Sequence, residues 1–425
     1  MKFVKRVMRK IKIHKIHIIL LFTLVACCAG LQAHGAQAHE LLARVDSFYS
    51  CVDMKEARLR TFRGSRRALN PFMERLDNVI ERKQGTLNIW HVGGSHVQAG
   101  IFSHRMRRNF ALYLNGGVAS RTILFPYKLV NTNGPTDYSV SGTGRWSRSR
   151  NIERSPSYEM GLTGITAVTS TPGASITFSM SRSGDIDWTT HYIRVLGTGS
   201  AGVRPYVVVD SVEIEDFEGN NEQGYFFEVP QGCNTFTIKF HGLGGGNRFE
   251  FRGAIALNGL PGVSYWASGI NGAATASWLR CSKLEQDLSV AKPDMVIFGI
   301  GINDAHTSHF NRDRFKENYQ QLIDKIKRVN PDCQFIFVTN NDNLFRSNVN
   351  PNTRGVEKVF IELALDNNGS VWDLYRVMGG YGGSKKWVRN SLMQSDHVHF
   401  TKAGYKLIGD LLYNAIMEQY LKWKE

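Results

Sequence analysis

The stretch Asn88-Ile-Trp-His-Val-Gly-Gly-Ser-His96 carries an apolar run into two glycines and then presents the hydroxyl of Ser95. An apolar run that ends in glycine is typical of a buried strand followed by a turn. Apolar residues then recur at four-residue spacing, which predicts a helix that ends at Gly116-Gly117. The apolar stripe of this helix consists of Phe102, Met106 and Phe110. The sequence therefore predicts a strand, an exposed nucleophile turn and a helix in succession.

The two ends of the chain repeat this alternation of strands and helices. Before the serine, Asn70 as the cap and Pro71 as the first helical residue predict a helix, and residues 87–92 predict a strand. The elements expected after residue 262 are strands at 295–298, 335–338 and 370–372, and helices after Gly272, across 315–330, around 353–365 and at the C-terminus. Alternating strands and helices imply a parallel sheet that is covered on both faces.

The segment from residue 125 to residue 261 has a different texture. Apolar residues alternate with period two, as in Ile176, Phe178 and Met180, and helical periodicity is nearly absent. The glycine-rich stretches 197–202 and 242–246 are expected to separate the strands. We therefore expect a β-sandwich over residues 125–261, inserted into an α/β domain made of residues 39–124 and 262–425.

Residues 1–38 differ from the rest of the chain. Seven Lys and Arg residues precede the apolar run 16–30. This run is shorter than the roughly 20 apolar residues that a membrane-spanning helix needs, so a secretory signal is expected. Ala36-Gln37-Ala38 suits cleavage by a signal peptidase, whereas Leu24-Val25-Ala26-Cys27 resembles a lipobox whose cysteine would carry a lipid. Both outcomes stay open. The protein is expected to be exported, either as a periplasmic protein or as an outer-membrane lipoprotein of the cell envelope.

Seven of the fifteen positive charges in the formal net charge of +15 belong to this signal. Loss of its seven basic residues lowers the charge to +8, and no basic cluster interleaved with aromatic residues remains, so nucleic-acid binding is not expected. Four cysteines stay in the mature chain without metal-site spacing, and they either form disulfides or remain buried thiols. These cysteines are Cys51, Cys233, Cys281 and Cys333.

Two later segments complement Ser95. Phe298-Gly-Ile-Gly-Ile-Asn-Asp304 follows a predicted buried strand, and Ser395-Asp-His-Val-His399 precedes the last helix. A serine hydroxyl attacks an ester readily only when a base takes its proton and hydrogen-bond donors stabilise the developing oxyanion. Ligands of open α/β sheets bind at the carboxyl ends of strands, where the serine and the first of these segments both fall. The expected roles are base for His399, orienting carboxylate for Asp396 and amide donor for Asn303.

In this order the segments resemble the SGNH (GDSL-type) hydrolases. Four blocks of the family are matched by Gly93-Gly94-Ser95-His96, by the glycine of Gly269-Ile-Asn-Gly272-Ala273, by Gly301-Ile-Asn303-Asp304 and by Asp396-His-Val-His399. The resemblance covers roughly residues 70–124 and 262–425 and implies a flavodoxin-like three-layer α/β/α fold. It also implies a triad of Ser95, Asp396 and His399, and an oxyanion hole made of the backbone amides of Ser95 and Gly272 and the side chain of Asn303.

Two positions depart from the family pattern. Gly94 stands where Asp is usual, and Ile302 stands where Thr is common. The first change removes a side chain that normally helps to fix the nucleophile turn, so Ser95 is expected to be held less firmly or the activity to be lower. The G-x-S-x-G elbow of α/β-hydrolases does not occur in the chain, which argues against that fold.

Other arrangements remain open. A metal site would use imidazole and carboxylate ligands, but it would leave Ser95 and Asn303 unexplained. Its candidate ligands are Asp304, His306, His309, Asp396, His397 and His399, although His397 is expected to be a loop residue. Aromatic residues of the β segment are candidate sugar-stacking platforms or ordinary packing residues. They are Trp188, Tyr192, Tyr206 and Tyr225.

The inserted β-sandwich resembles the carbohydrate-binding-like module of bacterial peptidoglycan O-acetylesterases. The resemblance implies an exported serine esterase that removes O-acetyl groups from a polysaccharide, with peptidoglycan as the leading substrate, through an acetyl-enzyme. No metal or organic cofactor is expected. An acetylxylan-type plant glycan is the alternative substrate. A carbohydrate-binding or O-acetylation accessory protein with a weakened catalytic site is the alternative function.

Overall fold

The computed structural model of the chain describes residues 41–45, 49–114, 118–180, 186–217 and 223–425. The predicted secretory signal, including Cys27, lies outside these residues. The chain divides into two units, Met1–Ala43 and Arg44–Glu425, and the account below concerns the second unit. No helix among the described residues combines the length and the apolar character that a membrane crossing requires.

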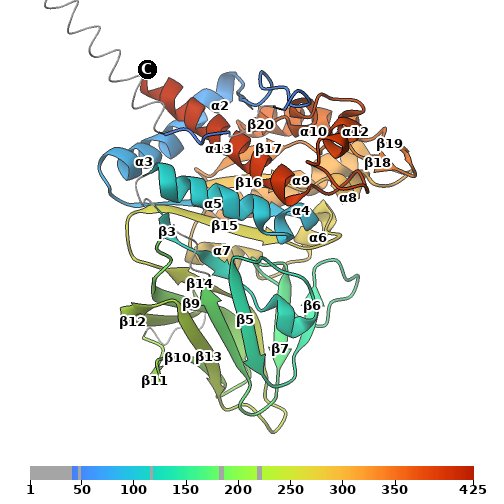
Figure 1. Cartoon of the computed structure of the whole chain (residues 1–425). Coiled ribbons are helices and arrows are strands. Elements are labelled where there is room, and N and C mark those ends of the chain that lie inside the picture. Colours follow the sequence, from blue (N-terminus) through green and yellow to red (C-terminus); the bar gives the residue numbers. More distant parts are fainter. Residues whose placement is uncertain (1–40, 46–48, 115–117, 181–185, 218–222) are drawn as a thin grey trace, which may run out of the picture. The chain divides into compact units, whose positions relative to one another are not determined.

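A seven-stranded sheet has the order β1-β20-β17-β16-β2-β15-β3, and all its neighbours pair in parallel except the edge strand β1 (Figure 1). Five strands lie side by side in the order β15, β2, β16, β17 and β20. If they are numbered by their order in the chain, this spatial order is 2-1-3-4-5, which is the flavodoxin-like arrangement. The bounds are β1 Leu59–Arg60, β2 Thr86–Gly93, β3 Val118–Ser120, β15 Gly262–Gly269, β16 Met295–Gly299, β17 Gln334–Val338 and β20 Ser370–Trp372.

Helices cover both faces of this sheet. Helix α13 packs against α3 and α5, which pack on β2 and β15, while α6, α7 and α10 pack on α9 at the other face (Figure 1). Burial on both faces explains why β17 is apolar and buried along almost its entire length. The helices are α2 Arg63–Ala68, α3 Asn70–Glu81, α4 Ser95–Gln98, α5 Ile101–Tyr113, α6 Thr275–Leu279, α7 Leu284–Val290, α8 Ile302–Ala305, α9 Arg312–Val329, α10 Thr353–Asn367, α11 Leu374–Val377, α12 Gly383–Arg389 and α13 Lys402–Lys424.

Two antiparallel sheets follow the first part of the α/β layer. One has the order β11-β10-β13-β8-β5, and the other has the order β12-β9-β14-β7-β6 with β4 paired to β14. Aromatic side chains from both sheets meet, because Phe178 of β8 lies against Phe251 of β14 with ring centroids 6.3 Å apart. The bounds are β4 Thr122–Leu124, β5 Tyr138–Thr143, β6 Ser147–Arg150, β7 Ile165–Thr169, β8 Ser175–Met180, β9 Thr190–Gly199, β10 Arg204–Val209, β11 Val212–Ile214, β12 Tyr225–Cys233, β13 Thr235–His241 and β14 Phe249–Leu257.

The fold class expected from the sequence is confirmed, namely a three-layer α/β/α domain accompanied by an antiparallel β module. The predicted boundaries at residues 125 and 261 stay a prediction. Strand β4 already belongs to the antiparallel part, and β15 belongs to the parallel sheet. A short 3-10 helix, Tyr127–Val130, and the hairpin β18 Leu344–Phe345 and β19 Asn348–Val349 complete the described elements.

Two local predictions were wrong. Asn70 is the first residue of α3 rather than its cap, because α2 leads into α3 through Leu69, whose backbone is already helical. The helix after Ser95 is two helices, α4 and α5, because Gly100 adopts φ 74° between them, where a Cβ atom would lie 2.7 Å from Pro135. The helix ends at Tyr113, and Gly116-Gly117 lies outside the described residues.

The stretch 197–202 separates β9 from β10 only in its second half, where Gly202 lies in the connecting turn with φ 80°. Gly197 and Gly199 lie inside β9, where a Cβ atom at Gly197 would meet the ring of Phe249 at 2.5 Å. Close packing against an aromatic ring, rather than a turn, accounts for this glycine. The stretch 242–246 does form a connection between β13 and β14 as predicted. The four cysteines of the described chain are free and buried, so the thiol alternative holds.

Candidate active site

Ser95 lies at the carboxyl end of β2, in the predicted strand, turn and helix unit. Strand β2 ends at Gly93, Gly94 precedes α4, and Ser95 is the first residue of that helix. Its side chain is half-buried, and its Oγ lies 2.9 Å from His399 Nε2. The neighbouring strands β15 and β16 end level with β2, since Gly93 is paired with Gly269 and with Gly299. The serine therefore stands where three parallel strands end together.

Asp396 holds His399 from the same turn. Its Oδ2 lies 2.8 Å from His399 Nδ1, and its Oδ1 accepts the backbone N–H groups of Val398 at 2.8 Å and of His399 at 2.9 Å. Burial raises the pKa of Asp396, but these hydrogen bonds outweigh burial and hold its pKa below the usual value. An ionised Asp396 accepts the Nδ1–H of His399, which leaves Nε2 unprotonated and able to accept from the Ser95 hydroxyl.

Asn303 lies beside the nucleophile turn. It is the second residue of α8, and a Cβ atom built on Gly94 would lie 3.3 Å from Asn303 Nδ2. The same Nδ2 donates to the carbonyl of Ala273 at 2.9 Å. Gly272, in the preceding turn, is exposed and has φ 82°, a conformation that suits glycine. Within the described chain, the backbone amides of Ser95 and Gly272 donate to no protein group. The three predicted oxyanion donors thus come from neighbouring turns.

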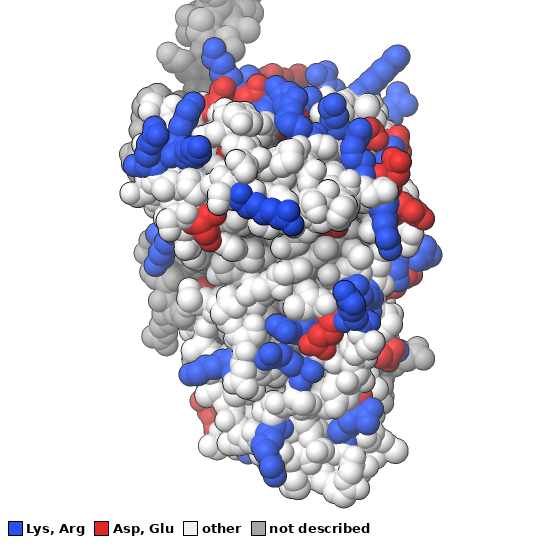
Figure 2. Space-filling view, turned by 90° about the vertical axis from the view of Figure 1, so that its right-hand side faces the viewer, with Lys and Arg blue, Asp and Glu red and all other residues white. Residues whose placement is uncertain are grey.

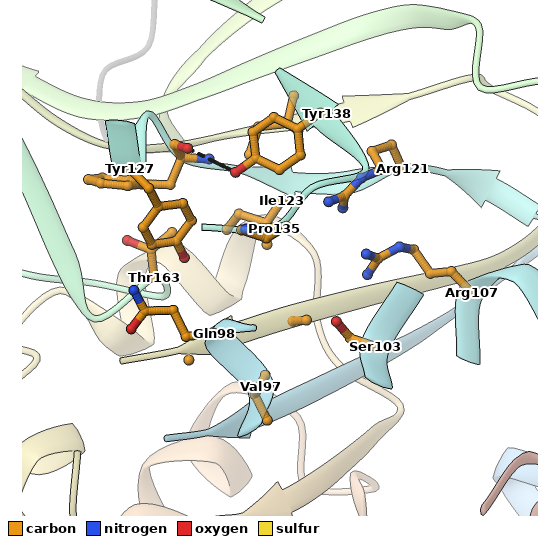
Figure 3. A pocket seen from close by; sticks show the side chains of 14 residues that line it. Val97, Gln98, Ser103, Arg107, Arg121, Ile123, Tyr127, Pro135, Tyr138 and Thr163 are labelled. Carbon is orange, nitrogen blue, oxygen red and sulfur yellow. Dashed lines mark hydrogen bonds between the residues drawn. The ribbon is translucent and has the colours of Figure 1, made fainter. Parts of the chain in front are cut away.

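Gln98 connects two of the turns around the site through hydrogen bonds. The sequence did not predict this role. Figure 3 shows Gln98 directed from α4 toward Tyr127 and Thr163. Its Oε1 accepts the backbone N–H of Asn271 at 2.5 Å, and its Nε2 donates to the carbonyl of Asn133 at 2.6 Å. The side chain is 3% exposed, so both partners depend on it. The sequence signal for Gln98 was a polar residue three positions after the serine, on the first turn of the helix that the serine begins.

A second group of missed residues lies behind the triad. His96 Nδ1 lies 2.8 Å from the hydroxyl of Tyr405 on α13, and burial lowers the pKa of His96 to about 3, so this imidazole is neutral. Asn341 donates to the carbonyl of Val398, the residue before the candidate base, at 3.2 Å. A cavity of about 30 Å³ lies between them, lined also by Asn340. The buried polar run Thr339–Asn343, directly after apolar β17, was the sequence signal for this support.

The alternative metal site is not assembled. Asp304 accepts the backbone N–H and the hydroxyl of Thr275, and His306 Nε2 lies 2.8 Å from the carbonyl of Leu344. Among the described residues, no three His, Cys, Asp or Glu side chains gather in a group that could hold a metal ion. His397 lies in the turn before the candidate base with φ 55°, as a loop residue.

Two of the four candidate sugar-stacking residues are buried. Trp188 is 5% exposed and Tyr225 is 3% exposed, so neither ring offers a face to a glycan, and that expectation was wrong for both. They pack in the interior, as large aromatic residues commonly do. Tyr192 and Tyr206 are half-buried, and each already stacks on a neighbour, Phe226 and His241 respectively. A sugar-binding role for these two residues stays a prediction.

Comparisons with known proteins match part of this sequence and its fold. The sequence model of the GDSL-like lipase/acylhydrolase family matches residues 237–407. A search of curated proteins gave no match. The solved structure of a peptidoglycan O-acetylesterase matches with a TM-score of 0.69 and 19% sequence identity, over 83% of this chain and 97% of that chain. This match includes the β module as well as the α/β domain, since it covers most of the chain.

Two further solved structures match shorter stretches. A lipase/acylhydrolase from Enterococcus faecalis is 27% identical, with a TM-score of 0.31 over 37% of this chain and 77% of that chain. An acetyl xylan esterase is 22% identical, with a TM-score of 0.30 over 36% of this chain and 81% of that chain. The family model over residues 237–407 and the shared fold thus make this chain similar to the GDSL-like (SGNH) esterases.

Proposed function

We propose that this protein is an exported serine esterase that removes O-acetyl groups from a polysaccharide, with peptidoglycan as the leading substrate. The observation that carries the proposal is the unbroken chain of hydrogen-bond contacts from Ser95 Oγ through His399 to Asp396. The shared fold with a peptidoglycan O-acetylesterase, over both the α/β part and the β module, supports the choice of substrate. Acetylated plant glycans such as acetylxylan are the alternative substrate.

The reaction begins when Ser95 Oγ attacks the carbonyl carbon of the acetyl ester. Its proton passes to His399 Nε2, and Asp396 stabilises the resulting imidazolium. The oxyanion accepts hydrogen bonds from the amides of Ser95 and Gly272 and from Asn303 Nδ2. The bond between the acetyl carbon and the sugar oxygen then breaks, and the sugar oxygen takes the proton from His399.

Water completes the cycle on the acetyl-enzyme. His399 takes a proton from the water, whose oxygen bonds to the acetyl carbon, and the proton returns to Ser95 Oγ as acetate leaves. The residues named here balance every proton, so the scheme requires no group beyond this chain and water.

The test compares the full-length protein with Ser95→Ala, using Ser289→Ala as the matched control. Ser289 is an exposed serine of α7. Acetate release from O-acetylated peptidoglycan, acetylxylan and an aryl acetate is measured, together with labelling by a fluorophosphonate. We expect Ser95→Ala to lose label and to lower kcat on the order of 10⁴-fold or more, and Ser289→Ala to behave as wild type.

The outcomes separate the alternatives. Faster hydrolysis of acetylxylan than of acetylated peptidoglycan would assign the plant glycan. Glycan binding without turnover of any acetate, and without labelling of Ser95, would make the protein an accessory binder. Unchanged acetate release by Ser95→Ala would refute the serine mechanism itself.

A further inference from the structure

A second pocket, with a volume of about 240 Å³, opens between α5, α13 and the loop that precedes β5. It is lined by Gly100 just before α5, by Ile101 and Arg108 of α5, by Lys402 and Lys406 of α13, and by Asp137 of the loop. We call it the basic pocket. The esterase reaction as derived above uses none of its side chains.

The basic pocket lies beside the catalytic residues. Gly100 follows α4 after a single residue, and α4 begins at Ser95. Lys402 is the third residue after His399, so their Cα atoms are at most about 11 Å apart. The contact of 2.8 Å between His96 Nδ1 and Tyr405 fixes α13 against α4. A polymer whose ester group is held at Ser95 therefore reaches this pocket with a neighbouring part of its chain.

Asp137 in the pocket and Asp410, which lies next to it as the partner of Arg105, are already paired with cations. Asp410 accepts from Arg105 through both oxygens, at 2.5 Å and 2.9 Å. Asp137 contacts two buried guanidinium groups, Arg107 at 3.0 Å and Arg121 at 2.7 Å. Figure 3 shows these two arginines directed toward one another. Burial raises the pKa of Asp137, but Arg121 and Arg107 outweigh it and hold this pKa well below the usual value. Neither acid is free to neutralise the remaining cations.

Three cations of the pocket are left without an acidic partner. In the part of the chain that the structure describes, Arg108, Lys402 and Lys406 form no ion pair and no hydrogen bond through their side chains. Both lysines are exposed, whereas Arg108 is half-buried and its Nε is shielded from solvent. Helices α5 and α13 also direct their N-terminal ends here, and the partial positive charge of those ends adds to the field.

Cations without a described ion pair also occur elsewhere, as at exposed Arg66 and Lys358, but in the basic pocket three of them line one hollow. On the face in Figure 2, Lys and Arg side chains are more prominent than Asp and Glu side chains, and acidic residues are scattered among them. Elsewhere on α9 and α10, basic residues do find acidic partners, as Lys316 does with Glu362 and Asp366. Unpaired cations around a concave site next to the nucleophile are suited to a carboxylate on the substrate.

We propose that the basic pocket binds a carboxylate of the glycan whose acetyl ester lies at Ser95. The inference rests on the proposed esterase function and narrows its substrate class to acetylated glycans that bear carboxylates. Peptidoglycan, with the carboxylates of its peptide stems, belongs to this class, whereas unsubstituted acetylxylan is neutral.

The experiment uses O-acetylated peptidoglycan fragments with free carboxylates and the same fragments with amidated carboxylates. The full-length variant Arg108→Gln/Lys402→Ser/Lys406→Ser is compared with Arg66→Gln/Lys358→Ser/Lys422→Ser, which removes three exposed charges from α2, α10 and the far end of α13. We expect wild type to prefer the free-carboxylate fragments, and the pocket variant to lose this preference by roughly tenfold in the ratio of kcat/KM values. The control variant should keep the preference for free-carboxylate fragments, and added salt should weaken this preference in wild type.

Several results would overturn the proposal. The proposal is overturned if wild type has equal kcat/KM values for the two kinds of fragment. It is also overturned if the pocket variant and the control variant lose the preference for free carboxylates equally. Salt-sensitive binding to phosphatidylglycerol vesicles that the pocket variant loses, without discrimination between fragments, would assign the cations to a lipid surface instead. If the triple variant fails to fold, the single changes at exposed Lys402 and Lys406 carry the same comparison.

A binding measurement tests the basic pocket even if the protein has no esterase activity. If wild type releases no acetate from any ester, binding of deacetylated fragments to Ser95→Ala still measures the pocket. Preference of that variant for free over amidated carboxylates would then support the pocket without the esterase, and no preference would refute the pocket.

Discussion

Asp396 has more partners in the site than its place in a triad requires. One oxygen faces His399 Nδ1, and the other accepts two backbone N–H groups of the turn that carries the histidine. The carboxylate therefore sets the conformation of the turn as well as the tautomer of the base. Its side chain is 46% exposed, so the turn is held by these bonds rather than by burial.

Replacement of the carboxylate by an amide should separate these effects. In Asp396→Asn the amide oxygen still accepts from the backbone, but an N–H can replace the acceptor at His399 Nδ1 and favour the wrong tautomer. We expect kcat on an aryl acetate to fall by roughly 10²–10⁴-fold with little change in KM. Steady-state kinetics measure this, with Asp366→Asn as the exposed control. A loss below threefold would mean that Asp396 does not set the tautomer.

Asn303 is expected to act on the oxyanion, because its amide lies beside Gly94 and next to the Gly272 turn. Asn303→Ala should lower kcat by about 10²–10³-fold, since the lost donor acts mainly in the transition state. Asn348→Ala, on the β19 hairpin strand, is the control. Stopped assays at several ester concentrations give kcat and KM. A rise in KM alone would make Asn303 a substrate-binding residue instead.

Gly94 marks the departure from the family pattern at the same turn. A Cβ atom there would lie 3.5 Å from the carbonyl of Ala273, which is ordinary contact, and 3.3 Å from Asn303 Nδ2, which would have to shift slightly. Without it, Ser95 still lies within hydrogen-bond distance of His399. The absence of a side chain at position 94 is therefore compatible with an assembled triad.

At the level of elements, Gln98 links α4 to two turns, Thr132–Pro135 and Ile270–Ala273. Gln98→Met keeps the size of the side chain and removes both hydrogen bonds, which leaves the amide of Asn271 and the carbonyl of Asn133 unpaired. We expect the turn that carries Gly272 to shift and kcat to fall roughly tenfold, with a stability loss of about 1–3 kcal/mol.

Kinetics and urea unfolding of the same preparation measure both effects of Gln98→Met. Gln321→Met, at a position of α9 exposed to solvent, controls for the substitution itself. Lower stability with unchanged kcat would mean that the Gly272 turn keeps its position without Gln98, and that the link is purely structural.

The elements predicted from the sequence are those whose pattern depends on burial alone. Strands β16, β17 and β20 read as short apolar runs because both faces of the sheet are covered, and α9 reads as an amphipathic helix that stops at Asn330-Pro331. Elements set by a single close approach were missed. The break between α4 and α5 depends on Pro135, which lies 35 residues beyond Gly100 in the chain.

The same division holds for the site. Ser95, Asn303, Asp396 and His399 could be named because each stands in a short motif at the end of a strand or before a helix. Their supports, such as Gln98, have no motif, since a hydrogen bond to Asn271 or Asn133 requires the folded chain. Burial of Trp188 and Tyr225 likewise depends on contacts made in the folded chain, with His104 of α5 and with Phe249 of β14 respectively.

At the scale of the whole molecule, a buried ion pair joins the β module to the α/β domain. Arg252 of β14 and Asp287 of α7 are 4% and 1% exposed at their side chains, with 3.0 Å between Nη2 and Oδ1. Asp287→Ala would leave the guanidinium buried without its partner, and we expect the free energy of unfolding to fall by about 3–5 kcal/mol. Glu285→Ala removes a more exposed carboxylate from the same helix, where it pairs with Arg328, and should cost at most about 1 kcal/mol.

Urea unfolding followed by tryptophan fluorescence compares the Asp287 and Glu285 variants. Equal small losses would show that Arg252 finds another partner or water. A split into two transitions in Asp287→Ala would show that the β module and the α/β domain had been coupled mainly through this pair.

Acid should destabilise the whole fold through His91, a fully buried residue of β2 that lies 2.8 Å from the hydroxyl of Tyr265. Burial, aided by Arg107, lowers its pKa from 6.5 to about 3, so the folded protein holds it neutral. Below about pH 6.5 the unfolded chain binds a proton that the folded chain excludes, and the free energy of unfolding therefore falls with pH until about pH 3. His91 contributes at most about 1.4 kcal/mol per pH unit to this slope.

Urea unfolding between pH 7.5 and pH 4 should give a shallower slope for His91→Gln than for wild type, while His309→Gln, at an exposed histidine, should match wild type. Parallel curves for His91→Gln and wild type would mean that His91 takes up its proton inside the folded protein.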